Sequence, residues 1–286
     1  MNKCKVGAII VTYNFDDRLK KSINTLYNQV DYIAIVDNNS NDRCVNYIDE
    51  LSKLENIRVI YNKENYGIAK AINQGIYLLL QLDCNWIMTL DDDSVLERDC
   101  VGKMLKIACN KKSNKIGAIC PNIYDINIKE YMYPLSCGYT NINKSIQSGA
   151  LFNSIVFNVV GLFNESLFIY YVDEDFFERL MLYKYEILRV NNAVINHSDG
   201  CLTKKKILWK KFDFNKRPCY AIYYRSRNCI YMIKNYGIKY CKDLLRDPIK
   251  IILYDNEKCR KLQYFIKGMI NGLFGKYGKI IESKKN

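Results

Sequence analysis

Short apolar runs alternate with longer amphipathic segments along the first 120 residues of the chain. Four runs are apolar and short enough to be buried strands, namely residues 6–11, 32–36, 57–61 and 86–90. Between them, apolar residues recur every three or four positions. This spacing predicts helices that contain Leu19, Ile23 and Leu26, then Val45, Ile48 and Leu51, and then residues 67–81. The alternation predicts an α/β fold, with a mostly parallel sheet covered by helices on both faces.

Polar residues directly follow three of these runs, at positions 12–14, 37–40 and 91–93. Ligands of such sheets bind beyond the carboxyl ends of the strands. The third segment is Asp91-Asp92-Asp93. Three adjacent carboxylates repel one another unless a cation lies among them, and hard oxygen ligands suit Mg²⁺ or Mn²⁺. An isolated acidic triplet is a solvated turn about as often as it is a metal site. Here the triplet coincides with the other polar strand ends, which favours a metal site that holds a phosphorylated ligand.

After the fourth apolar run, the sequence predicts a helix over residues 97–112 and a strand near residues 116–120. Residues 122–148 are polar and rich in tyrosine, which suggests the strands and loops of a substrate-facing region. An acidic helix follows later, and its buried face is predicted to consist of Phe176, Phe177, Leu180 and Met181.

Several protein classes fit the sequence poorly. The turn after the first strand lacks a G-x-G-x-x-G motif, which argues against a nicotinamide dinucleotide site. The twelve cysteines include no C-x-x-C pair, so we do not expect a zinc ribbon. We expect these cysteines to be reduced thiols. The first residues lead straight into a strand-like run, so we expect no signal peptide, and no apolar stretch is long enough to cross a bilayer. We therefore expect a cytoplasmic protein.

The net charge of +13 is concentrated at the carboxyl-terminal end. Residues 204–286 hold 22 Lys and Arg against 6 Asp and Glu, so residues 1–203 carry a net charge of −3. Basic and apolar residues are interleaved in this tail, which predicts amphipathic basic helices. Such helices can lie on the inner face of a bacterial plasma membrane or form a homodimer, and lysines that merely face water are the simpler alternative.

Several segments match one enzyme family in order and spacing. They are Val-Thr-Tyr-Asn, Val-Asp-Asn-Asn-Ser, Asn-Tyr-Gly-Ile-Ala-Lys-Ala-Ile-Asn, Leu-Asp-Asp-Asp-Ser and Val-Ile-Asn-His. Together they resemble the family 2 glycosyltransferases with the GT-A fold. The segments Leu-Phe-Ile-Tyr-Tyr-Val-Asp-Glu-Asp and Tyr-Arg-Ser-Arg-Asn are similar to the rhamnosyltransferase and galactofuranosyltransferase branch. The resemblance covers roughly residues 5–230.

This resemblance implies a domain organisation. Residues 1–203 would form the GT-A catalytic domain, with a nucleotide-binding half at about 1–120 and an acceptor-binding half at about 121–203. The charge and the amphipathic pattern, rather than the resemblance, predict a basic helical extension over residues 204–286.

The resemblance also implies roles for individual residues in an inverting transfer of a sugar from a nucleotide-sugar to a hydroxyl. The residues that would line the nucleotide pocket, contact the base or shape the adjoining loop are Thr12, Tyr13, Asn14, Asp37, Asn65 and Gly67. Asp91 and Asp93 would belong to the metal and ribose site. We expect Asp93 to be the principal ligand and Asp92 to orient the nucleotide side of the site. His197, the only histidine, stands where the family has a metal ligand, and imidazole suits Mn²⁺ somewhat better than Mg²⁺.

An inverting displacement needs a base to remove the proton of the acceptor hydroxyl, and Asp173, Glu174 and Asp175 are candidates. On a helix, Asp173 shares the inward side of Phe176 and Phe177, whereas Asp175 faces Arg179 in an exposed ion pair. Glu174 is expected on a solvated side. We therefore predict Asp173 as the base, although an N-cap is its structural alternative and the alignment allows a shift of one or two positions.

The predicted function is therefore metal-dependent sugar transfer to a glycan or polyprenyl-linked acceptor in bacterial surface polysaccharide synthesis. Among donors dTDP-rhamnose leads, and UDP-galactofuranose, UDP-galactose and UDP-glucose remain open. A metal-dependent nucleotidyltransferase would also use acidic strand ends. A nucleic-acid-binding protein would explain the basic tail but not the acidic triplet, so we expect no nucleic-acid partner.

Overall fold

The computed structural model describes residues 4–111, 113, 115–197, 202–207, 210–215 and 217–280. Within residues 202–215 only the backbone of two strands is described. The chain divides into two compact units. We call them the sheet unit, Met1–Phe163 with Phe176–Ser198, and the helical unit, Asn164–Asp175 with Asp199–Asn286.

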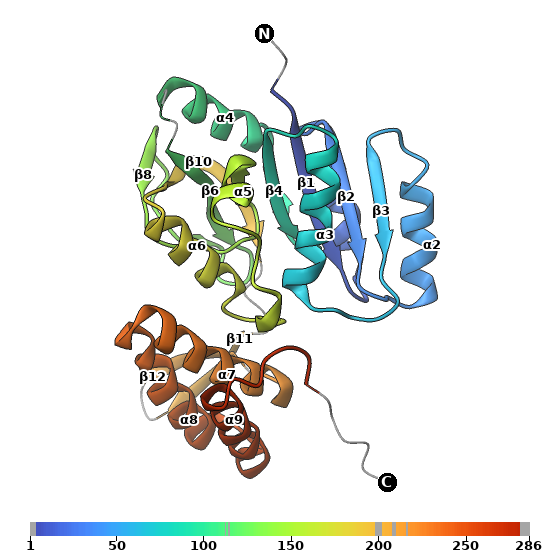
Figure 1. Cartoon of the computed structure of the whole chain (residues 1–286). Coiled ribbons are helices and arrows are strands. Elements are labelled where there is room, and N and C mark those ends of the chain that lie inside the picture. The colour runs from blue at the N-terminus through green and yellow to red at the C-terminus, as the bar shows by residue number, and fades with distance from the viewer. Residues whose placement is uncertain are drawn as a thin grey trace. The chain divides into compact units, whose positions relative to one another are not determined.

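A mixed sheet runs through the sheet unit in the order β3-β2-β1-β4-β9-β6-β10-β5 (Figure 1). Its strands are β1 (Val6–Thr12), β2 (Tyr32–Asp37), β3 (Ile57–Tyr61), β4 (Trp86–Asp91), β5 (Val95–Leu96), β6 (Ile116–Asp125), β9 (Leu151–Asn153) and β10 (Glu186–His197), with β7 (Glu130–Tyr131) and β8 (Tyr139–Asn141) paired at the side. The first four are parallel, as predicted, and β6 is parallel to β10. The short strand β9 joins the two halves by antiparallel pairing with β4 and β6.

Helices cover this sheet because each has one apolar face. The helices are α1 (Arg18–Leu26), α2 (Asp42–Leu51), α3 (Ile68–Gln81), α4 (Cys100–Lys111), α5 (Ile155–Val159) and α6 (Val172–Leu182), the last of which contributes to both units. In α1 the predicted face of Leu19, Ile23 and Leu26 is fully or almost fully buried. Helix α3 lies against β1, β2 and β4, whereas α4 lies against β6 and β10 (Figure 1). The α/β fold expected from the alternation is confirmed.

The helical unit contains α7 (Cys219–Tyr236), α8 (Cys241–Tyr254) and α9 (Lys258–Leu273), with short 3-10 turns at Glu165–Leu167 and Ile238–Tyr240. Helices α7 and α9 approach closely because α9 carries glycine at the crossing. A Cβ on Gly268 would lie 2.4 Å from the Tyr223 carbonyl oxygen, and one on Gly272 would lie 2.6 Å from that of Arg227. The close contact therefore depends on two positions without a side chain.

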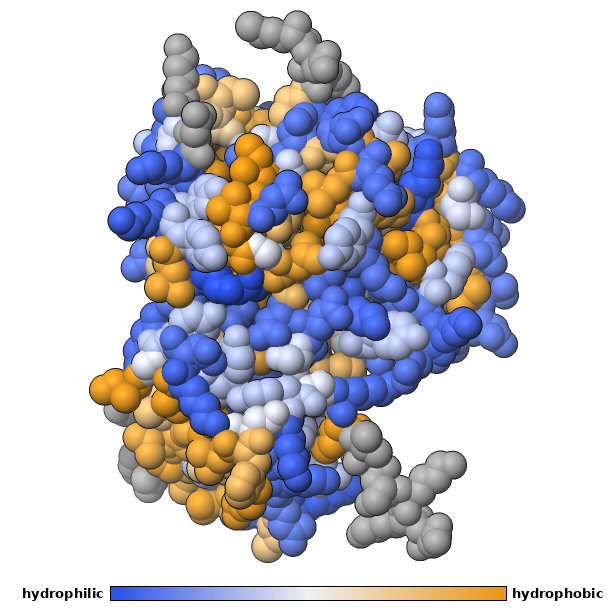
Figure 2. Space-filling model, in the orientation of Figure 1, coloured by the Kyte–Doolittle hydropathy of each residue, from blue (hydrophilic) through white to orange (hydrophobic). Residues whose placement is uncertain are grey.

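The basic tail is not helical throughout. The strands β11 (Leu202–Ile207) and β12 (Lys210–Asn215) pair with each other, so the expectation of a basic helix at the start of the tail is wrong. Further on, helices form as expected, and Figure 2 shows apolar side chains exposed over α8 and α9. Within the described part of the chain, no helix is both long and apolar enough to cross a bilayer. The eleven cysteines described there are free thiols.

Candidate active site

Strand register brings the polar strand ends of the sheet unit to one edge. Strand β1 lies between β2 and β4, with Thr12 opposite Asp37 and Val11 opposite Asp91. The Thr12 hydroxyl donates to Asp37 Oδ1 at 2.9 Å, and the Ser40 amide donates to Asp37 Oδ2 at 2.9 Å. Thr12 and Asp37 are both buried. These bonds fix the orientation of the Asp37 carboxylate. The Thr12 hydroxyl is therefore bonded to that carboxylate and does not face solvent.

The turn after β1 is tied to the turn after β2. Asn14 has a left-handed backbone, with φ 52°, which asparagine tolerates better than most residues. Its amide N–H donates to the Ser40 hydroxyl oxygen at 2.9 Å, and its side-chain oxygen accepts the Asn41 amide at 2.9 Å. Tyr13, which lies between Thr12 and Asn14 in the sequence, is 52% exposed. Of the three predicted pocket residues, Thr12 is buried, whereas Tyr13 and Asn14 are both exposed and accessible to a ligand.

The loop before α3 is held beside the end of β2 by amide side chains. Gly67 adopts φ 87° at the start of α3, and its N–H donates to Asn65 Oδ1 at 2.9 Å. The Asn38 side chain donates to the Gly67 carbonyl at 3.2 Å, and Asn62 donates to Asn38 Oδ1 at 2.9 Å. Sequence reasoning named Asn65 and Gly67 but missed Asn62, whose only signal was its place just after β3.

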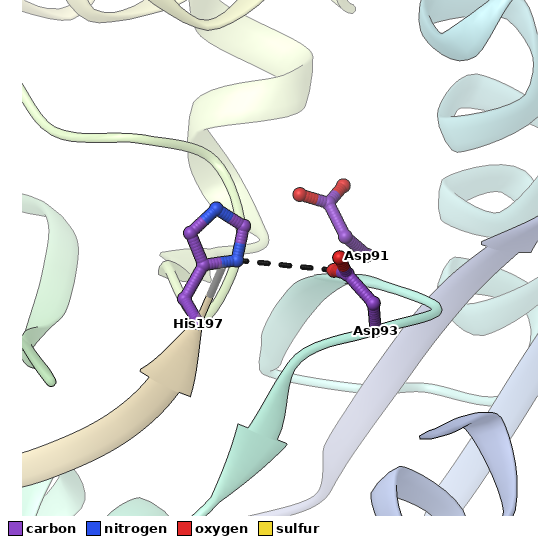
Figure 3. A group of neighbouring side chains, drawn as sticks. All are labelled: Asp91, Asp93 and His197. Carbon is purple, nitrogen blue, oxygen red and sulfur yellow. Dashed lines mark ion pairs between the residues drawn. The ribbon is translucent and has the colours of Figure 1, made fainter. Parts of the chain in front are cut away.

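Asp91, Asp93 and His197 lie together, and one potential ligand atom from each lies within 4.8 Å of the others (Figure 3). Asp91 ends β4 and His197 ends β10. The pair Asp93 Oδ1 and His197 Nδ1 is separated by 3.9 Å, and these side chains are 22% and 16% exposed. The acidic turn leads directly into β5, which pairs antiparallel with the end of β10. That pairing brings residues about a hundred positions apart to one place.

A chain of side-chain contacts supports this cluster. The Asp91 amide donates to the Ser148 hydroxyl oxygen at 3.0 Å, and Gln147 donates to Asp91 Oδ1. Ser148 donates to Ser94 at 2.8 Å, and the Ser94 oxygen lies 2.8 Å from His197 Nδ1. Partners of this kind fix the orientation of metal-binding side chains. Sequence reasoning missed Ser94 and Gln147 as parts of the site, although both lie within segments that it singled out.

The acidic turn concentrates negative charge. Burial, followed by the charges of Asp91 and Asp93, raises the pKa of Asp92 to about 7. Arg18 offsets part of this charge, since its Nη1 lies 3.1 Å from Asp93 Oδ2. Two carboxylates and one imidazole form a donor set suited to a divalent cation such as Mn²⁺. The site therefore fits a metal both in its donor atoms and in its unbalanced charge.

The three acids at the start of α6 belong to the helical unit and differ in environment. Asp173 is partly exposed, and its Oδ1 accepts the Glu174 amide at 3.1 Å. Asp175 is fully buried and accepts the hydroxyl groups of Tyr231 at 3.1 Å and Tyr236 at 2.7 Å. The expectation that Asp175 is exposed is therefore wrong, because aromatic residues of α7 enclose it.

Glu174 does not face open solvent, contrary to expectation. It is only partly exposed, and burial, followed by the charge of Asp173, raises the pKa of its carboxyl well above the ordinary value. A proton is therefore held more readily on Glu174 than on a solvated glutamate. In the sheet unit, Phe176, Phe177 and Leu180 are buried as predicted, whereas Met181, the fourth residue of the predicted face, is only partly buried.

The backbone just before these acids is strained. Phe168 has φ 64° and ψ −61°, and the Ile169 amide donates to the Leu167 carbonyl at 2.7 Å, which makes a γ-turn. Tyr170 and Tyr171 follow at φ 65° and 61°. Such conformations cost roughly 1–3 kcal/mol each for residues with a side chain. The surrounding structure must therefore stabilise this segment.

Comparisons with known proteins identify the family of the chain. The sequence profile of a family described as Glycosyl transferase family 2 matches residues 8–212. The dTDP-rhamnosyl transferase RfbF of Shigella flexneri is 28% identical over 244 residues, which cover 80% of each chain.

Solved structures share the fold at low identity. GalNAc-T7, solved with UDP, GalNAc and Mn²⁺, has a TM-score of 0.63 at 13% identity, over 96% of this chain and 56% of its own. This chain thus spans little more than half the length of that protein. The mannosyltransferase PcManGT of Pyrobaculum calidifontis, solved with GDP-Man and Mn²⁺, has a TM-score of 0.56 at 12% identity, over 95% and 88%. Because the profile covers most of the chain, the protein belongs to the family 2 glycosyltransferases and is a glycosyltransferase.

Proposed function

We propose that the protein is an inverting, metal-dependent glycosyltransferase that moves rhamnose from dTDP-rhamnose to a hydroxyl of a lipid-linked or oligosaccharide acceptor. The observation that carries this proposal is the grouping of Asp91, Asp93 and His197 at the edge of the sheet. The rhamnosyl donor is supported by the likeness to RfbF. The other nucleotide-sugars named above are the alternatives that the experiment below separates.

Asp93, Asp91 and His197 would hold the cation, Mn²⁺ or Mg²⁺, with Ser94 and Gln147 orienting them. A divalent cation bound there would neutralise the charge that develops on a departing nucleoside diphosphate. Asp92 would lie on the nucleotide side of these ligands. Arg18, which lies beside Asp93, adds a positive charge near the same position.

The nucleotide would lie along the ends of β1 and β2. Asp37, held by Thr12 and Ser40, would accept hydrogen bonds from the base. Tyr13 is exposed next to it, and Asn14, Asn65 and Gly67 shape the adjoining turns. Preformed turns reduce the conformational entropy that binding would otherwise cost.

Asp173 would be the base. It would take the proton of the acceptor hydroxyl as that oxygen attacks the anomeric carbon, while the bond from this carbon to the diphosphate breaks on the opposite side. Two features support Asp173 over its neighbours. Asp175 is buried against two tyrosine hydroxyl groups, and the raised pKa of Glu174 favours its neutral form.

The helical unit would attach the enzyme to an anionic membrane face. Helices α8 and α9 expose the large apolar side chains Leu245, Ile249, Ile252, Leu253, Ile266, Ile270 and Leu273, and Phe274 follows them. The net charge of +16 over residues 204–286 complements anionic lipid. Vesicles with and without phosphatidylserine test this: we expect Leu253→Glu to reduce pelleting with anionic vesicles. A dimer that dissociates in Leu253→Glu, without any vesicle binding, would assign the surface to a second copy instead.

The transfer proposal is tested with a panel of nucleotide-sugars and Mn²⁺, scored for release of nucleoside diphosphate. We expect release from dTDP-rhamnose that stops when EDTA removes the metal. Release from a different nucleotide-sugar alone would correct the donor. Formation of pyrophosphate from a nucleoside triphosphate and a sugar phosphate, without any release from nucleotide-sugars, would replace the proposal with a nucleotidyltransferase.

A further inference from the structure

One segment of the helical unit combines a strained backbone with hydrogen bonds to a single helix. It comprises residues 166–171 and leads directly into Asp173. We infer that Arg227 and Asn228 of α7 are positioning residues, which hold this segment so that Asp173 is presented in one orientation. The inference rests on the proposed function, in which Asp173 is the base.

Asn228 is fully buried and gathers three carbonyl groups of the segment. Its side-chain amide donates to the carbonyl oxygens of Leu167 at 2.9 Å, Ile169 at 2.8 Å and Tyr170 at 2.9 Å. These carbonyls converge because the backbone reverses at Phe168 and again at Tyr170. A carboxamide offers two N–H donors, and no carboxylate or aliphatic side chain of this size could replace it.

Arg227 binds the same segment from its other end. Its Nη2 donates to the carbonyls of Leu167 at 2.8 Å and Ser166 at 3.2 Å, and its Nη1 donates to that of Gly278. The guanidinium is completely buried, and this burial lowers its pKa. Burying a charged guanidinium costs more free energy than burying an apolar side chain of the same size. The hydrogen bonds of the Arg227 guanidinium to these carbonyl groups instead hold the backbone in one conformation.

Further contacts hold the residues on either side of Asp173. The Phe168 ring stacks on Tyr224 with ring centroids 5.0 Å apart. The Tyr171 hydroxyl donates to Asp243 at 2.8 Å, and Tyr231 and Tyr236 donate to Asp175. Asp173 thus lies between two anchored points, and neither anchor uses its own carboxylate. The backbone is therefore fixed on both sides of Asp173, whose carboxylate contacts only the neighbouring Glu174 among the contacts described above.

A first measurement needs no substrate. Hydrogen exchange of peptides covering residues 166–176 is compared in wild type, Asn228→Ala and Arg227→Lys, a milder variant that keeps the buried charge. Asn235→Ala is the matched control, because Asn235 lies on the same helix and its side chain donates to the Tyr231 carbonyl of that helix instead of to the segment. We expect exchange over this segment to be about tenfold faster in the two variants than in wild type and unchanged in the control. Exchange in β1 and β4 should be the same in all four proteins. Unchanged exchange in both variants would overturn the inference.

A second measurement separates positioning from mere stability. With dTDP-rhamnose, Mn²⁺ and water as the acceptor, we expect kcat to fall by about 100-fold in Asn228→Ala while the KM for the donor stays the same. Faster exchange with an unchanged kcat would refute the positioning role. Asp173→Asn is assayed in parallel: if that variant turns over normally, the assignment of the base fails, whereas the exchange result still decides whether α7 holds the segment.

Discussion

The acids of the two units are held in place by different means. At the edge of the sheet unit, Asp37 and Asp91 end strands whose positions follow from the parallel register with β1. In the helical unit, no described strand pairs with the segment before Asp173, which depends on side chains of α7. A hydrogen-bonded ladder spreads the stabilisation over many backbone groups, whereas the segment relies on a few buried side chains. We therefore expect the metal site to be sensitive mainly to its ligands and their direct partners, and Asp173 to be sensitive to residues of α7 as well.

Removing the principal predicted ligand should strongly weaken the binding of nucleotide. We expect Asp93→Ala to lower metal-dependent nucleotide affinity by about 100-fold or more, because one carboxylate and its charge leave the cluster. Isothermal titration of dTDP with and without Mn²⁺ measures this. Asp17→Ala, at a side chain that is 96% exposed, is the control and should bind normally. Equal affinity in Asp93→Ala and wild type would remove Asp93 from the metal site.

Asp173→Asn should separate chemistry from binding. We expect kcat to fall by about 100-fold to 10,000-fold, since the amide cannot accept the acceptor proton, while the KM for the nucleotide-sugar is retained. The measurement is steady-state turnover with varied donor. Glu174→Gln sharpens the comparison, because a glutamate that already favours its neutral form should lose much less. A larger loss in Glu174→Gln than in Asp173→Asn would move the base to Glu174.

Tyr236→Phe tests how strongly the base side depends on α7. This change removes the 2.7 Å hydrogen bond to the buried Asp175 carboxylate. We expect the free energy of unfolding to fall by about 1–3 kcal/mol, as is typical when a buried charged group loses a partner. Urea denaturation measures the change, with Tyr220→Phe, at an exposed position, as the control. An effect no larger than that of the control would show that the tyrosine does not anchor the segment.

Asp92→Asn should give the smallest effect, one that depends on pH. The folded-state pKa of about 7 lies above the ordinary 3.8, so the folded protein binds this proton more tightly than the unfolded chain. Stability from this group is therefore lost as the pH rises from about 4 to about 7. We expect Asp92→Asn to raise the Tm of EDTA-treated protein by a few degrees at pH 8 and hardly at all at pH 4. Added Mn²⁺ should reduce the difference, and a Tm shift independent of pH would contradict this account.

Local sequence signals predicted part of the site. The apolar runs predicted β1 to β4, and the rule for parallel sheets predicted that the residues after them meet at one edge. They did not predict the pairing of β5 with β10, which depends on residues far apart in sequence. Nor did helical spacing predict the burial of Asp175, because the tyrosines that enclose it come from α7.

By itself, the sequence determined the order of strands and helices, the acidic turn and the basic excess of the tail, because periodicity and charge are properties of neighbouring residues. Only the tertiary structure decided which of these groups meet. It brought His197 to Asp93 through strand pairing, and it turned residues 168–171 into a strained segment that α7 holds. Left-handed backbone at Phe168, Tyr170 and Tyr171 is unfavourable locally, so contacts from distant parts of the chain must stabilise it.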